Sequence, residues 1–242
     1  MSMVIGTNVA SLTAQRHLAS SRADMETSME RLASGSRINS AMDDSAGLAI
    51  SHRMDAKITG LNQGVRNGND GIAMIHVAEG ALEEISGILE RMKELSVQGA
   101  TGSYSASDRS AMSVEFVELH EEITRITTST DHNGTLVIGS AGTTGIQVGE
   151  TGTATDTISF DTTDVDSGAL GVSLSLSSVA NFNAANVAVD TAINTVDKQR
   201  GTLGAVANRL EHAVSNLMSR SENQSAARSR IEDTDFAVES AN

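Results

Sequence analysis

One long helical stretch constrains this chain more than any other feature. Residues 69–99 hold no proline, and their apolar residues recur alternately three and four positions apart. This spacing places the apolar residues on one stripe of an α-helix, at the seam positions of a heptad repeat. A helix of this length cannot cover its own stripe, so the sequence predicts partner helices. The predicted seam residues of this stretch are Ile75, Ala78, Leu82, Ile85, Leu89 and Met92.

Four further stretches show helical patterns. One of them runs from Ala46 to about Arg66, with apolar residues at Leu48, Ile50, Met54, Ile58 and Leu61. The segment before residue 39 repeats apolar residues every seven positions, and residues 39–47 are rich in turn formers that break or kink it. A helix ending near Ser129 is predicted after a loop, with Ser107 as its N-cap and a seam at Phe116, Leu119 and Ile123. A last helix begins near residue 183, and its seam residues are Leu203, Leu210 and Leu217.

The middle of the chain differs sharply from these helices. From residue 131 to about residue 180 it consists largely of Gly, Ser, Thr and Asp with β-branched residues. Short strands are predicted at 136–138, 157–160 and 172–176, and the last two alternate apolar and polar residues as a half-buried hairpin does. A disordered Ser/Thr linker is the alternative for this insert.

The predicted fold is therefore mainly α. We expect an elongated antiparallel helical bundle, a rod, in which the N- and C-terminal segments pair and the central insert adds a small β-hairpin element. The absence of proline from 242 residues and an aromatic content of only 2% agree with long helices packed through aliphatic side chains. The predicted parts are an N-terminal helical segment at 1–44, the N-terminal helices of the rod at 45–130, the insert at 131–182, the C-terminal rod helix at 183–231 and the start of a further segment at 232–242.

The charge of the chain argues against nucleic acid as a partner, and its composition argues against membrane insertion and cysteine-based sites. Lys and Arg number 17 against 31 Asp and Glu, which gives a net charge of −14 and a surface that repels nucleic acid. No apolar stretch is long enough to span a membrane, and the N-terminus has no cleavable signal pattern, so any export is expected to proceed without a cleaved signal peptide. The absence of cysteine excludes disulfides and thiolate metal sites.

No catalytic or cofactor-binding residue is predicted. His120 and Glu121 begin like a zinc-protease helix, but Thr124 stands where the second histidine is required. Asp161 and its neighbouring acidic residues resemble part of a calcium loop that lacks its closing glutamate. We therefore expect a chain that is not an enzyme and that holds no metal or cofactor.

Several long motifs together resemble bacterial flagellin, the subunit of the flagellar filament. They occur in the same order as in that family and cover about residues 1–130 and 190–242, and the insert corresponds to a short variable region. The motifs are IGTN at 5–8, ERLASGSRINSAMDD at 30–44, RNGNDG at 66–71, LGAVANRLEHAVSNL at 203–217 and SAARSRIEDTDF at 225–236.

The resemblance implies a structural subunit that polymerises into the extracellular flagellar filament for swimming motility. Its implied partners are further copies of itself, the flagellar export apparatus and the filament cap. Segments 1–44 and 232–242 would belong to the inner core of the filament. Flagellins continue beyond the SRIEDTDF motif into a terminal helix that binds an export chaperone. This chain stops at Asn242, so chaperone binding and polymerisation of this exact chain are left open.

The resemblance also implies contact with the flagellin-sensing Toll-like receptor of vertebrates. The matching positions are Arg91 as a charged donor, Leu95 as an apolar anchor and Glu115 as a charged acceptor. Packing between subunits is the alternative role of these residues. Two alternatives remain for the whole chain: a hook–filament junction protein, and a flagellin-like surface adhesin that binds through the insert.

Overall fold

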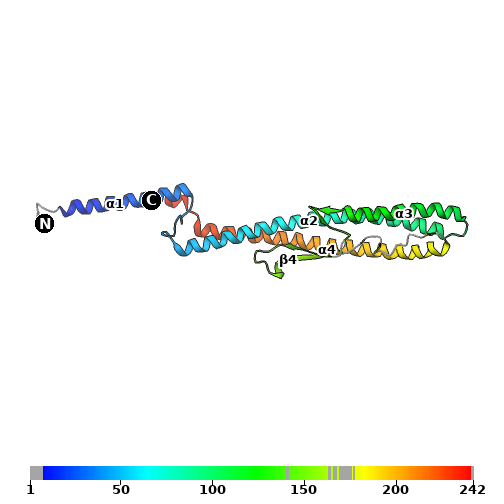
Figure 1. Ribbon diagram of the computed structural model, residues 1–242. Helices are drawn as coiled ribbons and strands as arrows, with labels where there is room; N and C mark the ends of the chain where they lie inside the picture. The colour runs from blue at the N-terminus through cyan, green and yellow to red at the C-terminus, as the bar shows by residue number, and fades with distance from the viewer. Residues whose placement is uncertain are drawn as a thin grey trace. The chain divides into compact units, whose positions relative to one another are not determined.

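The computed structural model of the chain describes residues 8–139, 142–162, 165, 168, 176 and 178–240. Most of these residues are helical, as predicted (Figure 1). The helices within the described residues are α1 (Val9–Ser34), α2 (Ser45–Ala100), α3 (Ala106–Ser129), α4 (Val179–Glu232) and α5 (Phe236–Glu239). The remaining elements are strands β1 (Asp131–His132), β2 (Thr135–Leu136), β3 (Gly142–Gln147) and β4 (Thr157–Thr162) and the 3₁₀ turn η1 (Ala154–Asp156).

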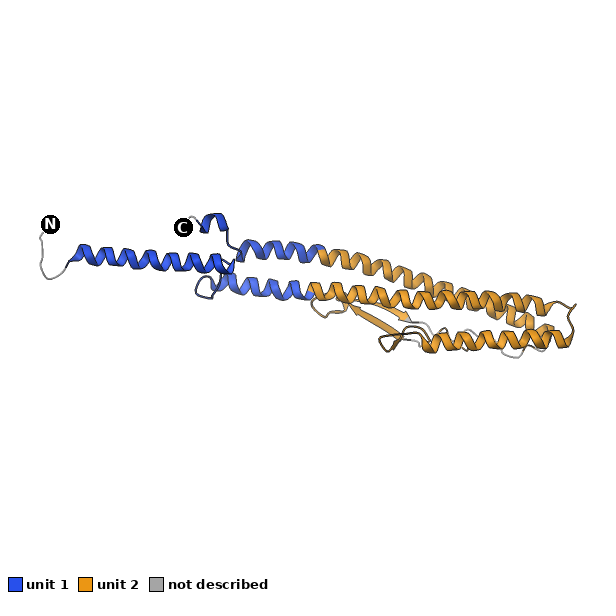
Figure 2. Ribbon diagram, turned by 90° about the horizontal axis from the view of Figure 1, so that it is seen from above, with its two compact units in different colours: residues 1–60, 219–242 blue, residues 61–218 orange. Residues whose placement is uncertain are grey.

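The chain divides into two compact units, which Figure 2 distinguishes by colour. Unit 1 consists of residues 1–60 and 219–242, and unit 2 consists of residues 61–218. Helices α2 and α4 are continuous and contribute to both units. The predicted helix at 46–66 and the stretch at 69–99 are thus parts of the single helix α2, because no helix-breaking residue separates them.

Unit 2 is a helical bundle in which α2 runs antiparallel to α3 and α4 (Figures 1 and 2). The predicted seam lies in its core. Leu119 is half-buried and packs against this core, and the other seam residues are buried: Ile75, Ala78, Leu82, Ile85, Leu89, Met92, Phe116, Ile123, Leu203, Leu210 and Leu217. The heptad pattern therefore identified the faces that pack together, and the mainly α bundle is confirmed.

A short loop joins α2 to α3, and its hydrogen bonds correct one detail of the prediction. The N-cap of α3 is Ser105, where the sequence suggested Ser107. The Ser105 hydroxyl accepts a hydrogen bond from the backbone N–H of Asp108 at 3.2 Å, and the Asp108 carboxylate accepts one from the backbone N–H of Ser105 at 2.9 Å. This reciprocal capping box fixes the start of the helix two residues earlier.

The insert forms two small antiparallel pairs, β1 with β2 and β3 with β4. Strand β4 covers the strand predicted at 157–160, but its partner β3 was not predicted, and it pairs Ile146 with Ile158. The strand predicted at 136–138 is wrong beyond Leu136, because Val137 and Ile138 are buried outside any strand. The strand predicted at 172–176 lies outside the described residues except for Leu176, which is buried.

Two amide side chains hold the β3–β4 pair against the helices of unit 2. Asn67 of α2 donates from Nδ2 to the carbonyl oxygen of Gln147 at 2.9 Å. Gln199 of α4 donates from Nε2 to the carbonyl oxygen of Asp161 at 2.8 Å. Between these bonds, Phe160 is buried in the same core as the helix seam. The pair is therefore an integral part of unit 2.

In unit 1 the segments that follow α1 and α4 pair with each other. Ser36 and Asp233 form an antiparallel bridge. The backbone N–H of Arg37 donates to the carbonyl oxygen of Glu232 at 2.6 Å, and that of Thr234 donates to Gly35 at 3.0 Å. Segments from the two ends of the sequence are thus joined through backbone hydrogen bonds, as expected for paired N- and C-terminal segments.

Candidate assembly surfaces

Helix α1 has 26 residues, and none of them is buried. Four of its apolar residues nevertheless recur at steps of seven, four and three positions, which places them within one narrow arc of the helix. They are Leu18, Met25, Met29 and Leu32. The first three are 59%, 56% and 64% exposed. We call these four residues the α1 stripe. It has the pattern of a packing face but is largely uncovered in the single chain.

An isolated helix of this length gains little stability from its own hydrogen bonds. Helices in proteins are held mainly by burial of an apolar face, and α1 is about 39 Å long at 1.5 Å per residue. A side-chain cap and a left-handed glycine define the two ends of α1. Asn8 caps its start by accepting a hydrogen bond from the backbone N–H of Ser11, and Gly35 ends it in a left-handed conformation with φ of 74°. The uncovered stripe is therefore the feature of α1 that is left to bind another surface.

Helix α5 adds a second exposed apolar area to unit 1. Phe236 is 71% exposed and Val238 is 57% exposed. The helix is held against the end of α1 by an ion pair between Arg31 and the buried Glu239, with 3.4 Å between Nη1 and Oε1. Asp235 caps α5 by accepting hydrogen bonds from the backbone N–H groups of its second and third residues. Two helices of unit 1 thus present apolar side chains to solvent.

On unit 2 the predicted charged positions lie together on one exposed surface. Arg91 of α2 donates from Nε to Glu115 of α3 at 2.9 Å and from Nη1 to Glu94 at 2.8 Å. Both hydrogen bonds raise the pKa of Arg91 above its ordinary value, and the bond with Glu94 has a larger effect than the bond with Glu115. The three side chains remain between 46% and 68% exposed. The structure therefore brings Arg91 and Glu115 together as a preformed charged surface.

Leu95 lies elsewhere. Its side chain is only 2% exposed and belongs to the core of unit 2. In this structure it cannot act as an exposed anchor beside Arg91, because the helix turns it toward the seam. The exposed apolar residue of the same stretch is Val97, at 52%. Helical spacing distinguishes the two, because Leu95 follows Met92 by three residues and lies beside the seam, whereas Val97 follows it by five and lies on the other side of the helix.

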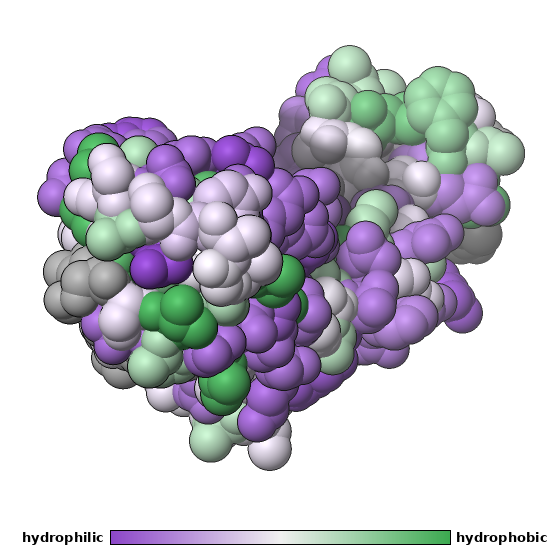
Figure 3. Space-filling view, turned by 90° about the vertical axis from the view of Figure 1, so that its right-hand side faces the viewer, coloured by the Kyte–Doolittle hydropathy of each residue, from purple (hydrophilic) through white to green (hydrophobic). Residues whose placement is uncertain are grey.

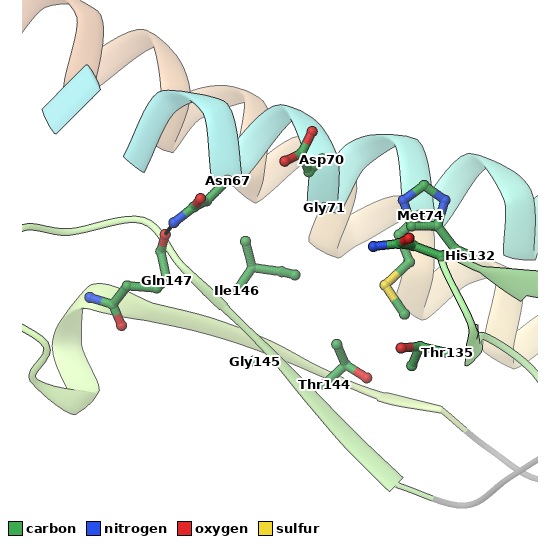
Figure 4. Close-up of a pocket in the computed structure, with 11 residues that line it drawn as sticks. Asn67, Asp70, Gly71, Met74, His132, Thr135, Thr144, Gly145, Ile146 and Gln147 are labelled. Atoms are coloured by element: carbon green, nitrogen blue, oxygen red, sulfur yellow. Dashed lines mark hydrogen bonds between the residues drawn. The ribbon is translucent and has the colours of Figure 1, made fainter. Parts of the chain in front are cut away.

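A recess in unit 2 lies between α2 and β3, with a volume of about 600 Å³. Met74 of α2 and Ile146 of β3 supply its apolar lining, while His132, Thr135 and Thr144 face it from the strands (Figure 4). We call it the β3 recess. Gly71 lines it on the helix side, where an added Cβ would lie 2.9 Å from Ile146 Cγ1. The motif RNGNDG at 66–71 supplies part of its lining, but the recess could not be predicted from it, because the other walls come from separate segments.

Within the described ranges, no three His, Asp or Glu side chains gather closely enough to hold a metal ion. None of the helices in that part of the chain is both long and apolar enough to cross a membrane. Figure 3 shows hydrophobic residues as small patches among hydrophilic ones over the near part of the face, with several adjacent hydrophobic residues at its upper right.

A helical bundle with an uncovered helical stripe is typical of one class of protein, the structural subunits that pack with further chains. Family models place the chain within this class. The bacterial flagellin N-terminal helical region matches residues 5–143, and the bacterial flagellin C-terminal helical region matches residues 187–242.

Relatives and a solved structure agree with these matches. A flagellin of Halalkalibacterium halodurans is 42% identical over 98% of this chain and 88% of its own length. The flagellar filament 33 kDa core protein of Treponema phagedenis is 38% identical over 98% of this chain and 88% of its own length. The crystal structure of Bacillus cereus flagellin matches with a TM-score of 0.57 at 31% identity, over 67% of this chain and 94% of that one.

The chain therefore belongs to the bacterial flagellin family, and it is a structural subunit of the flagellar filament. The family resemblance read from the sequence motifs is confirmed. The structure of a putative flagellar hook-associated protein from Vibrio parahaemolyticus also matches, with a TM-score of 0.64 at 16% identity over 79% of this chain and 100% of that one, which shows a shared fold alone. The sequence relatives described above are a flagellin and a filament core protein.

Proposed function

We propose that the α1 stripe is the surface through which each subunit binds other copies in the filament. The observation that supports this proposal is a 26-residue helix that keeps the pattern of a packing face yet buries none of its residues. Burial of a leucine or methionine side chain contributes about 1.5–3 kcal/mol. Four such residues per subunit give a substantial driving force for association.

The same proposal accounts for the exposed residues of α5. Phe236 and Val238 lie in the unit that carries the α1 stripe, and both are more than half exposed. Contacts between different surfaces of successive copies generate an open polymer when the rotation between them does not close a ring. An assembly of this kind needs no catalysis and no cofactor, so we propose neither for this chain.

Its place of action follows from this role. We propose that the subunit is exported through the flagellar apparatus, is added to the growing filament beneath the filament cap and acts outside the cell. The resemblance of its sequence motifs to those of flagellins supports these partners. A net charge of −14 keeps unassembled copies mutually repulsive and therefore soluble.

A second candidate function is recognition by the flagellin-sensing Toll-like receptor of vertebrates. Arg91 and Glu115 support it, because both are exposed and their mutual ion pair holds them in a fixed geometry. A planar guanidinium and a neighbouring carboxylate suit directional polar contacts with a partner protein. Leu95 is left out of this proposal because it is buried.

Elongation of short flagellar filament seeds, followed by electron microscopy, tests the assembly proposal. The test variant is Leu18→Gln with Met25→Gln, which removes apolar area while keeping good helix formers. The matched control is Ser20→Gln with Ala23→Gln, on the opposite face of α1. We expect the control to elongate seeds as the parent chain does and the test variant to fail. Equal elongation by the two variants would show that the stripe is not the assembly surface.

A further inference from the structure

The methionines among the described residues fall into two groups by their exposure. One group lies in the core of unit 2, where an oxidant in solution does not reach the sulfur atoms: Met74, Met92 and Met112. The other group is more than half exposed and consists of Met25, Met29, Met42 and Met218. Oxidation of a thioether follows its accessibility. The subunit therefore presents a small, defined set of reactive sulfur atoms.

Two of these exposed methionines form the centre of the α1 stripe. Met25 and Met29 lie one helical turn apart on the same face of α1, between Leu18 and Leu32. The other two lie outside the stripe, Met42 in the loop after α1 and Met218 on α4. Reactive sulfur and the proposed assembly face thus coincide at positions 25 and 29.

A peroxide changes the polarity of such a side chain without breaking the backbone. The thioether sulfur attacks one peroxide oxygen, so an S–O bond forms as the O–O bond breaks. Sulfur gives up an electron pair, and hydrogen peroxide, reduced by that pair, leaves as water once its proton has moved to the departing oxygen. The product is methionine sulfoxide, a polar side chain in place of an apolar one.

A sulfoxide is poorly suited to an apolar interface. Its oxygen accepts hydrogen bonds and has no hydrogen to donate, and the neighbouring stripe residues Leu18 and Leu32 carry no side-chain donor. Burying a polar group without a hydrogen-bond partner opposes association. None of the residues of α1 is buried, so a sulfoxide on this helix does not enter the core of the subunit. Its effect on assembly is therefore separable from unfolding.

We propose that Met25 and Met29 form an oxidation switch, at which a peroxide converts both thioethers to sulfoxides and blocks addition of the subunit to the filament. This inference rests on the proposed assembly function of the α1 stripe. The free subunit is sensitive because both side chains are exposed, whereas a neighbouring copy that covers the stripe shields them. Enzymatic reduction of the sulfoxides, by one reductase for each epimer, restores the apolar face.

Seed elongation after peroxide treatment tests the switch. The test variant is Met25→Leu with Met29→Leu, which conserves apolar character and volume but cannot form a sulfoxide. The matched control is Met42→Leu with Met218→Leu, which removes the exposed thioethers outside the stripe. Hydrogen peroxide should raise the critical concentration of the parent chain and of the control at least about tenfold. It should leave that of the test variant unchanged.

Peptide mass spectrometry locates the reaction independently of elongation. In the free subunit we expect Met25 and Met29 to be oxidised at least about tenfold faster than the buried Met92. In filaments their oxidation should be at least about tenfold slower than in the free subunit. The thermal unfolding of the treated parent chain should match that of the untreated chain, and treatment with both sulfoxide reductases should restore its elongation.

Three outcomes would overturn the switch. They are the same loss of elongation in the test variant and the parent chain, normal elongation by a parent chain that carries both sulfoxides, and equal oxidation rates at Met25, Met29 and Met92. Failure of the switch is distinguishable from failure of the assembly proposal. If Leu18→Gln with Met25→Gln abolishes elongation but the doubly oxidised parent chain elongates, only the switch is refuted. If that Gln variant elongates normally, the stripe is not the assembly surface and the switch fails with it.

Discussion

Two glycines of α2 are predicted to respond in opposite directions to the same substitution. Gly64 is buried where the β3 end of the insert crosses the helix, and an added Cβ would lie 2.8 Å from the carbonyl oxygen of Val148. The same Cβ would lie 3.3 Å from Leu217 Cδ1. Gly80 is exposed on the same helix, and an added Cβ there would have no atom within 4 Å.

The magnitudes follow from these surroundings. Replacing an interior helical glycine with alanine gains about 1 kcal/mol of helix stability when there is room. Gly80→Ala should therefore raise the melting temperature by roughly 2–4 °C for a chain of this size. Overpacking against a backbone carbonyl costs about 1–3 kcal/mol. Set against the helical gain, this cost leaves Gly64→Ala less stable, with a melting temperature lower by roughly 2–4 °C.

Thermal unfolding followed by circular dichroism measures both variants under one set of conditions. The comparison is internally controlled, because helix, substitution and added volume are the same in the two proteins. Stabilisation of Gly64→Ala by as much as Gly80→Ala would refute the close packing of the insert on α2. It would also contradict the position of the β3 recess, which forms where the insert packs on α2.

Three further outcomes are expected. Arg91→Glu places a third carboxylate beside Glu94 and Glu115 and should raise the concentration for half-maximal receptor activation in reporter cells about tenfold, whereas Arg125→Glu on α3 should not. Leu89→Ala leaves a cavity in the fully buried seam and should lower the free energy of unfolding by about 2–5 kcal/mol in a denaturant titration. The hydrogen bonds that the Asp43 carboxylate accepts from Ser40 and Asn39 lower its pKa in the folded chain. Asp43 therefore stabilises the loop at residues 39–43 fully above the ordinary carboxyl pKa of about 3.9, and this effect is lost as pH falls through the lower folded value. Amide signals of this loop should shift in that acidic range by NMR, and an identical response in Asp43→Asn would contradict the assignment.

The helical part of this fold could be predicted because each helix buries one stripe. Leu82, Ile85 and Leu89 occupy heptad positions, and the structure leaves each of them 0% exposed. The same spacing in α1 correctly gave a helix, although its stripe stays exposed in the single chain. Periodicity thus identifies a packing face but not the molecule that covers it.

The insert was harder to predict for a physical reason. Strand β3 reads GTTGIQ, which has only one large apolar residue and two glycines, so neither alternation nor β-propensity marks it. Its position depends on tertiary hydrogen bonds from Asn67 and on pairing with β4. Cap positions also depend on side-chain geometry, which is why Ser105 rather than Ser107 begins α3.

Among the residues that the resemblance named, Arg91 and Glu115 lie together on one exposed surface, and their contact with a receptor stays a prediction. Leu95 is buried instead, because its position three residues after Met92 places it beside the seam. The break at residues 39–47 was predicted from its turn formers, but the carboxylate–backbone hydrogen bonds that shape this loop could not be predicted from the sequence.

Hydrogen–deuterium exchange of the same chain before and after addition to filament seeds tests the central claim most directly. That claim is that other copies cover the α1 stripe. The account predicts fast exchange across residues 9–34 in the unassembled subunit and strong protection of this segment in the filament. Slow exchange in the core helices of unit 2 should be present in both states. Filaments in which residues 9–34 exchange as fast as in the free subunit would contradict the account.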